Sequence, residues 1–253
     1  MCAVFLICGV TKNILIFNES ERINIYNMRI NKLLSNRGIC SRRETNRIIE
    51  EKRITVNGKL CEAGQWVKES DIILIDNRPI PVKDKVYIAL NKPVGITCTA
   101  AKGVESNIIK FINYPEYIFP VGRLDKASQG LILMTNDGDL SNKISKAENR
   151  HEKEYIVTLN RPFDDVFMKE MSDGVEICGV VTRPCTVSRV SDNTFRIILT
   201  QGLNKQIRRM SKALGYKVIR LERIRIMNIK IDGIDMGKWR NLTEEEVEGL
   251  RNW

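Results

Sequence analysis

The sequence of 253 residues predicts an α+β protein in which a small N-terminal module precedes a larger domain with a mixed, largely antiparallel sheet. The length suffices for one or two domains. A polar stretch with two prolines, DNRPIPVKDK at residues 76–85, is typical of a hairpin or a linker and separates a helical first part from a strand-rich second part. In the second part, strand-like and helical segments do not alternate strictly, which favours α+β over a parallel α/β fold. The expected divisions are therefore a module over 28–75, a linker over 76–85 and a domain over 86–253.

The first 27 residues do not share this order. The opening MCAVFLICGV is apolar but has neither a basic n-region nor a clear cleavage site, so a signal peptide is a weak interpretation. Met28 stands directly before the first periodic segment, and we expect residues 1–27 to be a non-native or disordered extension. No segment approaches the roughly 20 apolar residues that span a bilayer, and no membrane partner is expected.

The small module is predicted to hold two helices and a hairpin. Apolar residues over 30–34 recur at helical spacing, and Gly38 stands where that helix would end. Ser41-Arg42-Arg43-Glu44 matches a capping box, which opens a second helix. Asn57-Gly58 lies between short alternating segments and predicts a type I′ hairpin.

The larger domain is predicted from apolar patterns and helix-start signals. Strands are expected over residues 118–121, 131–135, 155–159 and 195–200, and helices over 140–147, 164–171 and 204–214. Asp137-Gly138 is typical of a turn and Asp139 of a helix N-cap, while Thr243–Glu246 forms a capping box for a C-terminal helix.

Charge favours a polyanionic partner, nucleic acid first. Lys plus Arg number 41 against 31 for Asp plus Glu, a net charge of +10 with a pI near 9.3. Residues 29–53 hold eight basic side chains against three acidic ones, and residues 201–225 hold eight against one, Glu222. Arginine-rich excess of this kind suits phosphate contacts. The predicted RNA-binding residues are Arg29, Lys32, Arg37, Arg42, Arg43, Arg47, Lys205, Arg209 and Lys212, and Arg223 is grouped with general phosphate contacts.

Cysteine and histidine usage argues against metal and redox sites. The seven cysteines are scattered without a C-x-x-C pair, which argues against a disulfide framework or zinc ribbon and favours a reducing cytoplasm. A single histidine excludes multi-histidine metal sites. We expect neither metal nor nucleotide cofactor.

One carboxylate stands out in VGRLDKASQGLILM. Asp125 precedes an apolar run, and a lone buried carboxylate is costly unless a partner compensates it. It is therefore either a surface turn residue or part of a site with a cation. In a helix that begins near Asn204, Ile207 and Met210 point inward, so that Arg208 and Arg209 flank that face. The sequence does not choose which of the two would face Asp125.

Motif order suggests a family. The segment MRINKLLSNRGICSRRETNRIIEEKRITVNGK resembles an S4 RNA-binding domain over residues 28–75. NKPVGITCT, VGRLDKASQG, EKEYIV and GLNKQIRRM, spread over residues 87–231, resemble the motifs of pseudouridine synthases of the RsuA family. Gln201 with Leu203, the short 106–120 connection and RHEKEY are most similar to its large-subunit branch, RluF.

This resemblance implies roles for individual residues. Asp125 falls on the essential aspartate, Arg208 on the basic residue that forms an ion pair with it, and Tyr155 on the tyrosine that stacks on the target base. Ile207 and Arg123 fall in the pocket for that base. Lys92-Pro93 matches a first motif that is mainly structural.

The implied activity is isomerisation of uridine to pseudouridine in ribosomal RNA, at one uridine of 23S rRNA, on a flipped-out base and without a cofactor. tRNA stays open as a second substrate, and a cytoplasmic monomer is expected. Whether Asp125 attacks C1′ or abstracts the 2′ proton stays open. One alternative is a non-catalytic S4-type rRNA-binding protein. A glycoside hydrolase is disfavoured because no second acid shares a motif with Asp125.

Overall fold

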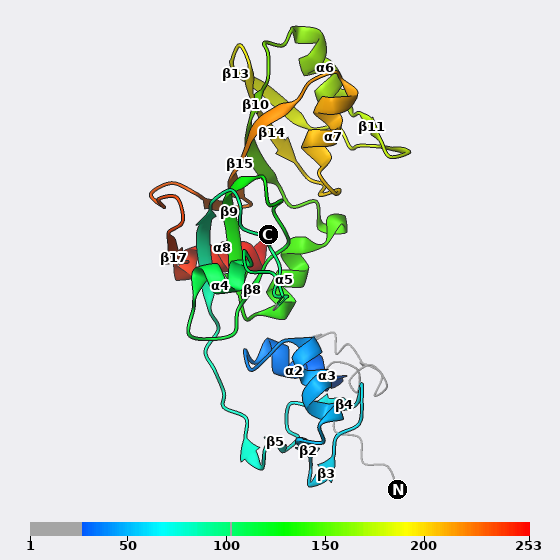
Figure 1. The fold of residues 1–253 in the computed structure, drawn as a ribbon, viewed down its shortest axis with the longest axis vertical. Helices are drawn as coiled ribbons and strands as arrows, with labels where there is room; N and C mark the ends of the chain where they lie inside the picture. The colour runs from blue at the N-terminus through cyan, green and yellow to red at the C-terminus, as the bar shows by residue number, and fades with distance from the viewer. Residues whose placement is uncertain (1–26, 102) are drawn as a thin grey trace, which may run out of the picture.

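The computed structural model describes residues 27–101 and 103–253 (Figure 1). The expected extension over 1–27 lies outside the described residues, except for Asn27. Asn27 belongs to the first strand, where it pairs with Lys68.

The N-terminal module contains two helices and six short strands. These are β1 (Asn27–Arg29), α2 (Ile30–Asn36), α3 (Arg42–Glu50), β2 (Ile54–Val56), β3 (Lys59–Leu60), β4 (Trp66–Lys68), β5 (Ile73–Ile75) and β6 (Arg78–Pro79). Ser41 caps α3 by accepting a 3.1 Å hydrogen bond from the backbone N–H of Glu44. Asn57 and Gly58 both have positive φ between β2 and β3, which confirms the predicted hairpin. The predicted helices and hairpin are thus present.

The module has its own apolar core and extends further than the sequence suggested. Ile30, Leu33 and Leu34 are at most 1% exposed, within a cluster that α2, α3 and the strands share. A second hairpin turns at Asp76 and Asn77, both at positive φ, and pairs β5 with β6. Of the two interpretations of residues 76–85, a hairpin or a linker, the hairpin holds for residues 76–79, which belong to the module's sheet.

The larger domain is built on one mixed sheet. Its elements are β7 (Tyr87–Lys92), α4 (Ile108–Ile112), β8 (Phe119–Pro120), β9 (Gln129–Thr135), α5 (Gly138–Ser145), η1 (Ala147–Asn149), β10 (Lys153–Leu159), α6 (Asp165–Asp173), β11 (Glu176–Ile177), β12 (Val180–Val181), β13 (Thr186–Ser191), β14 (Thr194–Leu199), α7 (Gln206–Ala213), β15 (Val218–Ile226), β16 (Ile229–Lys230), β17 (Trp239–Asn241) and α8 (Glu244–Asn252). The strand order is β13-β14-β10-β15-β9-β7-β17, with β8 beside β9 and β16 beside β15. Only β15 and β9 run parallel among these pairs, so the predicted α+β class and largely antiparallel sheet are confirmed.

Both faces of the central strands are covered, which explains the apolar run that follows Asp125. In β9, Ile132 and Met134 pack into a core that includes residues of α6 and α7, whereas Leu131 and Leu133 pack into a second core with residues of α5 and α8. In Figure 1, α6 and α7 lie beside one half of the sheet and α5 and α8 beside the other. A strand buried on both faces reads as a continuous apolar run. The run LILM is therefore a core strand.

Two helix starts test the predicted caps. Thr243 and Glu246 form the predicted capping box at α8. At α5 the prediction is wrong by two residues, because Asp137 is the N-cap and accepts from the backbone N–H groups of Asp139 and Leu140. The carboxylate of Asp139 does not cap the helix and instead forms an ion pair with Lys32 of the module at 2.7 Å.

The module contacts the larger domain through α2. Besides the Lys32–Asp139 pair, the side-chain amide of Asn36 donates to Asp139 at 3.1 Å. The ammonium of Lys85 donates to the backbone carbonyl of Asn36 at 2.7 Å.

In the described ranges, no helix is both long enough and apolar enough to cross a membrane.

Candidate active site

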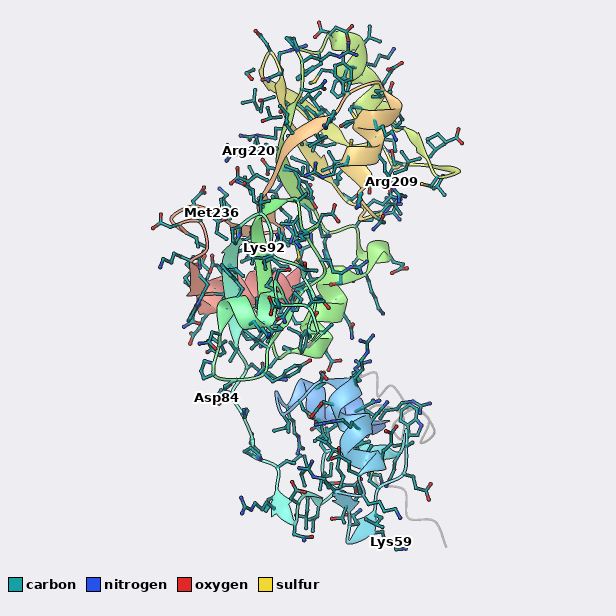
Figure 2. The ribbon with its side chains drawn as sticks, viewed as in Figure 1. Lys59, Asp84, Lys92, Arg209, Arg220 and Met236 are labelled. Atoms are coloured by element: carbon teal, nitrogen blue, oxygen red, sulfur yellow. The ribbon has the colours of Figure 1, made fainter. Side chains whose placement is uncertain are left out.

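A cavity lies between the loop before β9, strands β10 and β15, and the start of α7. Its volume is about 560 Å³, within the range of small-molecule sites. It is lined by Arg123, Asp125, Lys126, Lys146, Lys153, Tyr155, Lys205, Ile207, Leu221 and Arg223, among others. The cavity thus unites the predicted site residues Asp125, Tyr155, Ile207 and Arg123. Figure 2 shows Lys92, just beyond this lining, in the middle of the larger domain.

The loop that carries Asp125 is fixed by backbone hydrogen bonds. The N–H of Ser128 donates to the carbonyl of Asp125 at 3.0 Å, and the N–H of Gly95 donates to the carbonyl of Lys126 at 2.8 Å. Leu124, which precedes the aspartate, is buried. Asp125 itself is half-buried, so its carboxylate lies at the wall of an open cavity and not in a sealed core.

Lys92 supports the neighbouring turn. Its side chain is fully buried, and its ammonium donates to the carbonyls of Pro93 and Ile96, both at 2.9 Å. Burial lowers the pKa of Lys92, and the charge of Asp125 opposes part of that lowering. The side chain thus stabilises the turn that contacts the Asp125 loop, which agrees with its predicted structural role.

Gly130 lets the loop join the sheet. It has φ +103, and a Cβ there would lie 2.3 Å from the backbone carbonyl oxygen of Arg223 on β15. Arg223 and Gly130 are register partners in the one parallel strand pair of this sheet. Only glycine allows this close backbone approach, which places the Asp125 loop against β15.

A bulge sets which side chains face the cavity from β10 and β15. Glu154 pairs with Arg225 but Tyr155 pairs with Arg223, so Ile224 is the extra residue. Bulges of this kind redirect side chains and are common beside active sites. As a result Tyr155, which is 9% exposed, lies directly opposite Arg223, and both line the cavity.

Arg208 does not make the predicted ion pair. In the part of the chain that the structure describes, no salt bridge joins Arg208 to Asp125. Its guanidinium donates instead to the carbonyl of Ala127 at 2.9 Å, to the hydroxyl of Ser128 at 3.2 Å and to the carbonyl of Val218 at 3.1 Å. The prediction is corrected because these oxygens, two of them shortly after Asp125, take up both terminal nitrogens of Arg208, while its buried Nε has no hydrogen-bond partner among the described residues. Arg208 ties α7 to the Asp125 loop and to β15.

Two cations in the cavity wall were not predicted as site residues, and Arg223 was grouped only with general phosphate contacts. Arg223 is 3% exposed; its Nε donates to the carbonyl of Leu131 at 2.7 Å, and one terminal nitrogen has no hydrogen-bond partner among the described residues. Lys153 is half-buried, and burial together with the charge of Arg223 lowers its pKa to about 8. Lys153 lies in the motif EKEYIV, two residues before Tyr155. Residues two apart in a strand share a face, so the sequence already indicated that Lys153 lies on the same face as Tyr155.

The predicted RNA-binding residues fall into three groups. Arg42, Arg43, Lys205 and Lys212 are exposed. Arg29, Arg37, Arg47 and Arg209 are engaged within the protein: Arg29 with the carbonyl of Gly64, Arg37 with the carbonyl of Glu69, Arg47 with Glu44, and Arg209 with Asn204 and Cys178. Lys32 forms the interdomain pair with Asp139. Figure 2 shows Arg209 on the half of the domain that carries α7.

A second hollow, of about 390 Å³, lies where the module meets the larger domain. Arg42 and Arg43 line it from α3, and Thr99, Tyr117 and Ser141 line it from the larger domain. Exposed arginines of the module therefore lie beside the domain that carries Asp125.

Comparison with known proteins agrees with this geometry. A family model described as RNA pseudouridylate synthase matches residues 86–213, and an S4 domain model matches residues 28–73. The chain belongs to the RNA pseudouridine synthase family. It is 50% identical over 226 residues to the dual-specificity RNA pseudouridine synthase RluF of Shigella flexneri, covering 88% of this chain and 78% of that protein, with the same figures for Escherichia coli K12.

Two more distant pseudouridine synthases extend the comparison. The ribosomal large subunit pseudouridine synthase B of Bacillus subtilis is 30% identical over 232 residues, covering 88% of this chain and 95% of that one. A crystal structure of a pseudouridylate synthase superposes with a TM-score of 0.65 at 28% identity, covering 88% of this chain and 99% of the other. The RsuA-type resemblance, the S4 module and the enzyme class predicted from the motifs are confirmed.

Proposed function

We propose that this pseudouridine synthase isomerises a uridine of ribosomal RNA, at one position of 23S rRNA, with Asp125 as the reacting carboxylate. The observation that carries the proposal is the cavity itself. It brings Asp125, Tyr155 and Ile207 together from three separate segments, in a space suited to a single base. A related protein bears the name ribosomal large subunit pseudouridine synthase B, which supports the large-subunit substrate.

The reaction requires no cofactor. The N1–C1′ bond of uridine breaks, the base turns, and a C5–C1′ bond forms while the C5 proton is lost and N1 gains one. Asp125 either attacks C1′ to form a covalent ester or takes the 2′ proton to leave a glycal. Both routes need an ionised carboxylate at the cavity wall, where the half-buried Asp125 lies.

The uridine must leave its helix before any of these bonds is accessible. Flipping a base costs a few kcal/mol. Stacking on an aromatic ring offsets about 1–3 kcal/mol per base. Tyr155 lines the cavity with its ring and is the side chain we assign to this stacking. Ile207, 4% exposed, closes the apolar side, and Arg123 lies at the exposed rim.

Arg208 acts on Asp125 through the loop. Its hydrogen bonds to Ala127 and Ser128 hold the residues two and three positions after the aspartate. Such a clamp restrains the loop that carries the carboxylate, and this matters because misplacement by about 1 Å can cost a hundredfold in rate. We therefore assign Arg208 as a positioning residue.

A second RNA substrate is supported by the relatives called dual-specificity RNA pseudouridine synthases. We propose tRNA as that substrate. Arg42 and Arg43 of the S4 module would contact phosphates and fix the register, while the choice of uridine depends on RNA shape and on bases that can be splayed out. The enzyme would work as a cytoplasmic monomer.

The rival function is a non-catalytic rRNA-binding protein. Asp125 and Tyr155 in one cavity favour the enzyme, because a binding module needs neither. The test is to incubate the purified chain with 23S rRNA and with tRNA that lack pseudouridine, and to map pseudouridine at nucleotide resolution. One discrete new site in 23S rRNA supports the proposal, and tight binding without any new site supports the rival.

A further inference from the structure

The proposed reaction creates a charge that the assigned residues do not compensate. When the N1–C1′ bond breaks, its electron pair leaves with N1, and the base becomes a uracil anion whose charge spreads over N1 and the two carbonyl oxygens. C1′ is left bonded to Asp125 or joined to C2′ by a double bond. The anion forms on either route, so whatever stabilises it lowers the barrier of both. Preorganised donors aimed at a developing charge are the largest catalytic term in many enzymes.

Two cations that neighbour Tyr155 in the sheet line the cavity. Lys153 precedes Tyr155 by two residues on β10 and therefore shares its face. Arg223 is the register partner of Tyr155 on β15, because of the bulge at Ile224. Both side chains line the cavity that contains Asp125.

Neither cation is neutralised by the protein. Within the described ranges, neither Lys153 nor Arg223 has an ion-pair partner. One terminal nitrogen of Arg223 is buried without a hydrogen-bond partner, and the ammonium of Lys153 makes a 3.3 Å hydrogen bond to the carbonyl of His151. By contrast, Arg225 on the same strand pairs with Glu152 at 2.9 Å and with Glu154 at 2.6 Å.

The buried Arg223 and the half-buried Lys153 have no ion-pair partner, and such an arrangement costs folding free energy. That cost is visible in the pKa of Lys153, which burial and the charge of Arg223 lower to about 8. Lys92, fully buried nearby, has its pKa lowered for the same first reason. A bound anion would relieve the repulsion.

We propose that Lys153 and Arg223 hold the uracil anion after the N1–C1′ bond breaks, and keep it in the cavity until C5 bonds to C1′. This inference rests on the proposed function of Asp125. A phosphate is the other candidate anion. The base fits better, because Arg223 is almost fully buried beside the ring of Tyr155 and the apolar side chains of Ile207 and Leu221. Exposed cations at the rim, such as Lys126 and Lys205, suit phosphates.

The test is a leaving-group experiment with RNA that carries uridine or 5-fluorouridine at the target position. Fluorine withdraws electrons and stabilises the departing anion, so the 5-fluorouridine substrate depends less on protein cations. Single-turnover loss of the target nucleoside, measured with saturating enzyme, does not depend on later loss of the C5 proton. The variants are Lys153→Gln, Lys153→Arg and, as a matched control on an exposed residue of β16, Lys230→Gln.

We expect Lys153→Gln to slow the uridine substrate about 10²- to 10³-fold, as removal of one stabilising donor does elsewhere. The 5-fluorouridine substrate should slow by at least about tenfold less, since part of the stabilisation is built into the base. Lys153→Arg should restore most of the rate, and Lys230→Gln should match wild type. Equal slowing of both substrates, or weaker RNA binding at an unchanged rate, would overturn the proposal in favour of a phosphate contact or a structural role.

A pH profile gives an independent readout. The charged side chains around Lys153 in the cavity wall are Arg123, Asp125, Lys126, Lys146, Lys205 and Arg223. The cationic form of Lys153 is the active one, so kcat/KM of wild type should fall as the pH rises through about 8, while Lys153→Arg should stay flat there. The same fall in both proteins contradicts the proposal. A wild-type enzyme that modifies neither substrate would overturn the proposed function and this inference with it, whereas a wild type that modifies uridine no faster than Lys153→Gln would overturn this inference alone.

Discussion

The guanidinium of Arg208 donates a 2.9 Å hydrogen bond to the carbonyl of Ala127, two residues after Asp125. The same guanidinium reaches Val218 at the start of β15. Arg208 therefore links the helix, the strand and the loop that together form the cavity wall. A basic residue that was expected to touch the carboxylate instead holds the backbone beside it.

This geometry predicts that Arg208→Gln lowers kcat and leaves KM nearly unchanged. Loss of the clamp lets the Asp125 loop move, and we expect a fall in kcat of about a hundredfold. Arg208→Lys should recover only part of the rate, because a point charge cannot replace a planar fork of donors. Steady-state kinetics on a minimal RNA hairpin separates the two constants. A rise in KM with kcat intact would show that Arg208 binds RNA.

The ring of Tyr155 should matter more than its hydroxyl. We expect Tyr155→Phe to retain most activity, because the stacking face and the core volume stay. Tyr155→Leu keeps the apolar packing but loses stacking worth about 1–3 kcal/mol, which lowers the rate roughly 5- to 150-fold. Rates with RNA whose target uridine is already unpaired provide the check, since such RNA should reduce the defect. A Phe variant as impaired as the Leu variant would assign the function to the hydroxyl.

Gly130→Ala should damage the site through the backbone. The added Cβ would lie 2.3 Å from the carbonyl oxygen of Arg223, and the residue has φ +103. Backbone strain alone costs about 1–3 kcal/mol, and separation of β9 from β15 adds to it. Gly103→Ala is the matched control, since nothing lies within 4 Å of its Cβ position. Urea unfolding of both variants gives the comparison, and equal stability would contradict the tight contact.

Lys153→Met should stabilise the RNA-free protein near neutral pH. The pKa of Lys153 in the folded state, about 8, lies below its ordinary value of 10.5, so the folded state binds this proton less tightly than the unfolded state does. The resulting cost is complete below about pH 8 and disappears as the pH rises through 10.5. At about 1.36 kcal/mol per pKa unit, the difference between 10.5 and about 8 sets an upper bound of about 3 kcal/mol, and because Lys153 is only half-buried the variant should gain about 1–3 kcal/mol at neutral pH. Unfolding free energies at pH 7 and pH 10 should show this gain shrinking, and a gain that does not change with pH would contradict the burial of the charged group.

Local signals in the sequence were sufficient for much of the fold. The Asn57-Gly58 turn and the Thr243–Glu246 capping box depend on neighbouring residues only, and both are present as predicted. Strand β15 was not predicted because basic residues interrupt its apolar pattern. The bulge at Ile224 also breaks the alternation of buried and exposed residues that identifies a strand. The N-cap of α5 was placed two residues late because Asp137 was assigned to a turn, whereas it accepts from the backbone N–H groups of Asp139 and Leu140, and Asp139 pairs with Lys32.

The residues that line the cavity could be predicted from motifs. Their hydrogen-bond partners could not, because these come from segments that are distant in the sequence. Asp125, Tyr155 and Ile207 do line one cavity, as the motifs implied. The partners of Arg208 and the burial of Arg223 depend on backbone carbonyls at Ala127 and Leu131, which lie about 80 to 90 residues away in the sequence. Every residue carries a backbone carbonyl, so residue type does not indicate which carbonyl accepts a distant hydrogen bond.

The central claim is that the carboxylate of Asp125 carries out the isomerisation. The direct measurement is single-turnover pseudouridine formation in 23S rRNA by wild type, Asp125→Asn and the exposed control Asp192→Asn, with RNA affinity measured in parallel. The account predicts one new pseudouridine with wild type and with Asp192→Asn. With Asp125→Asn it predicts none, although RNA binding is unchanged. Formation of the same pseudouridine by Asp125→Asn at a rate close to that of wild type would contradict it.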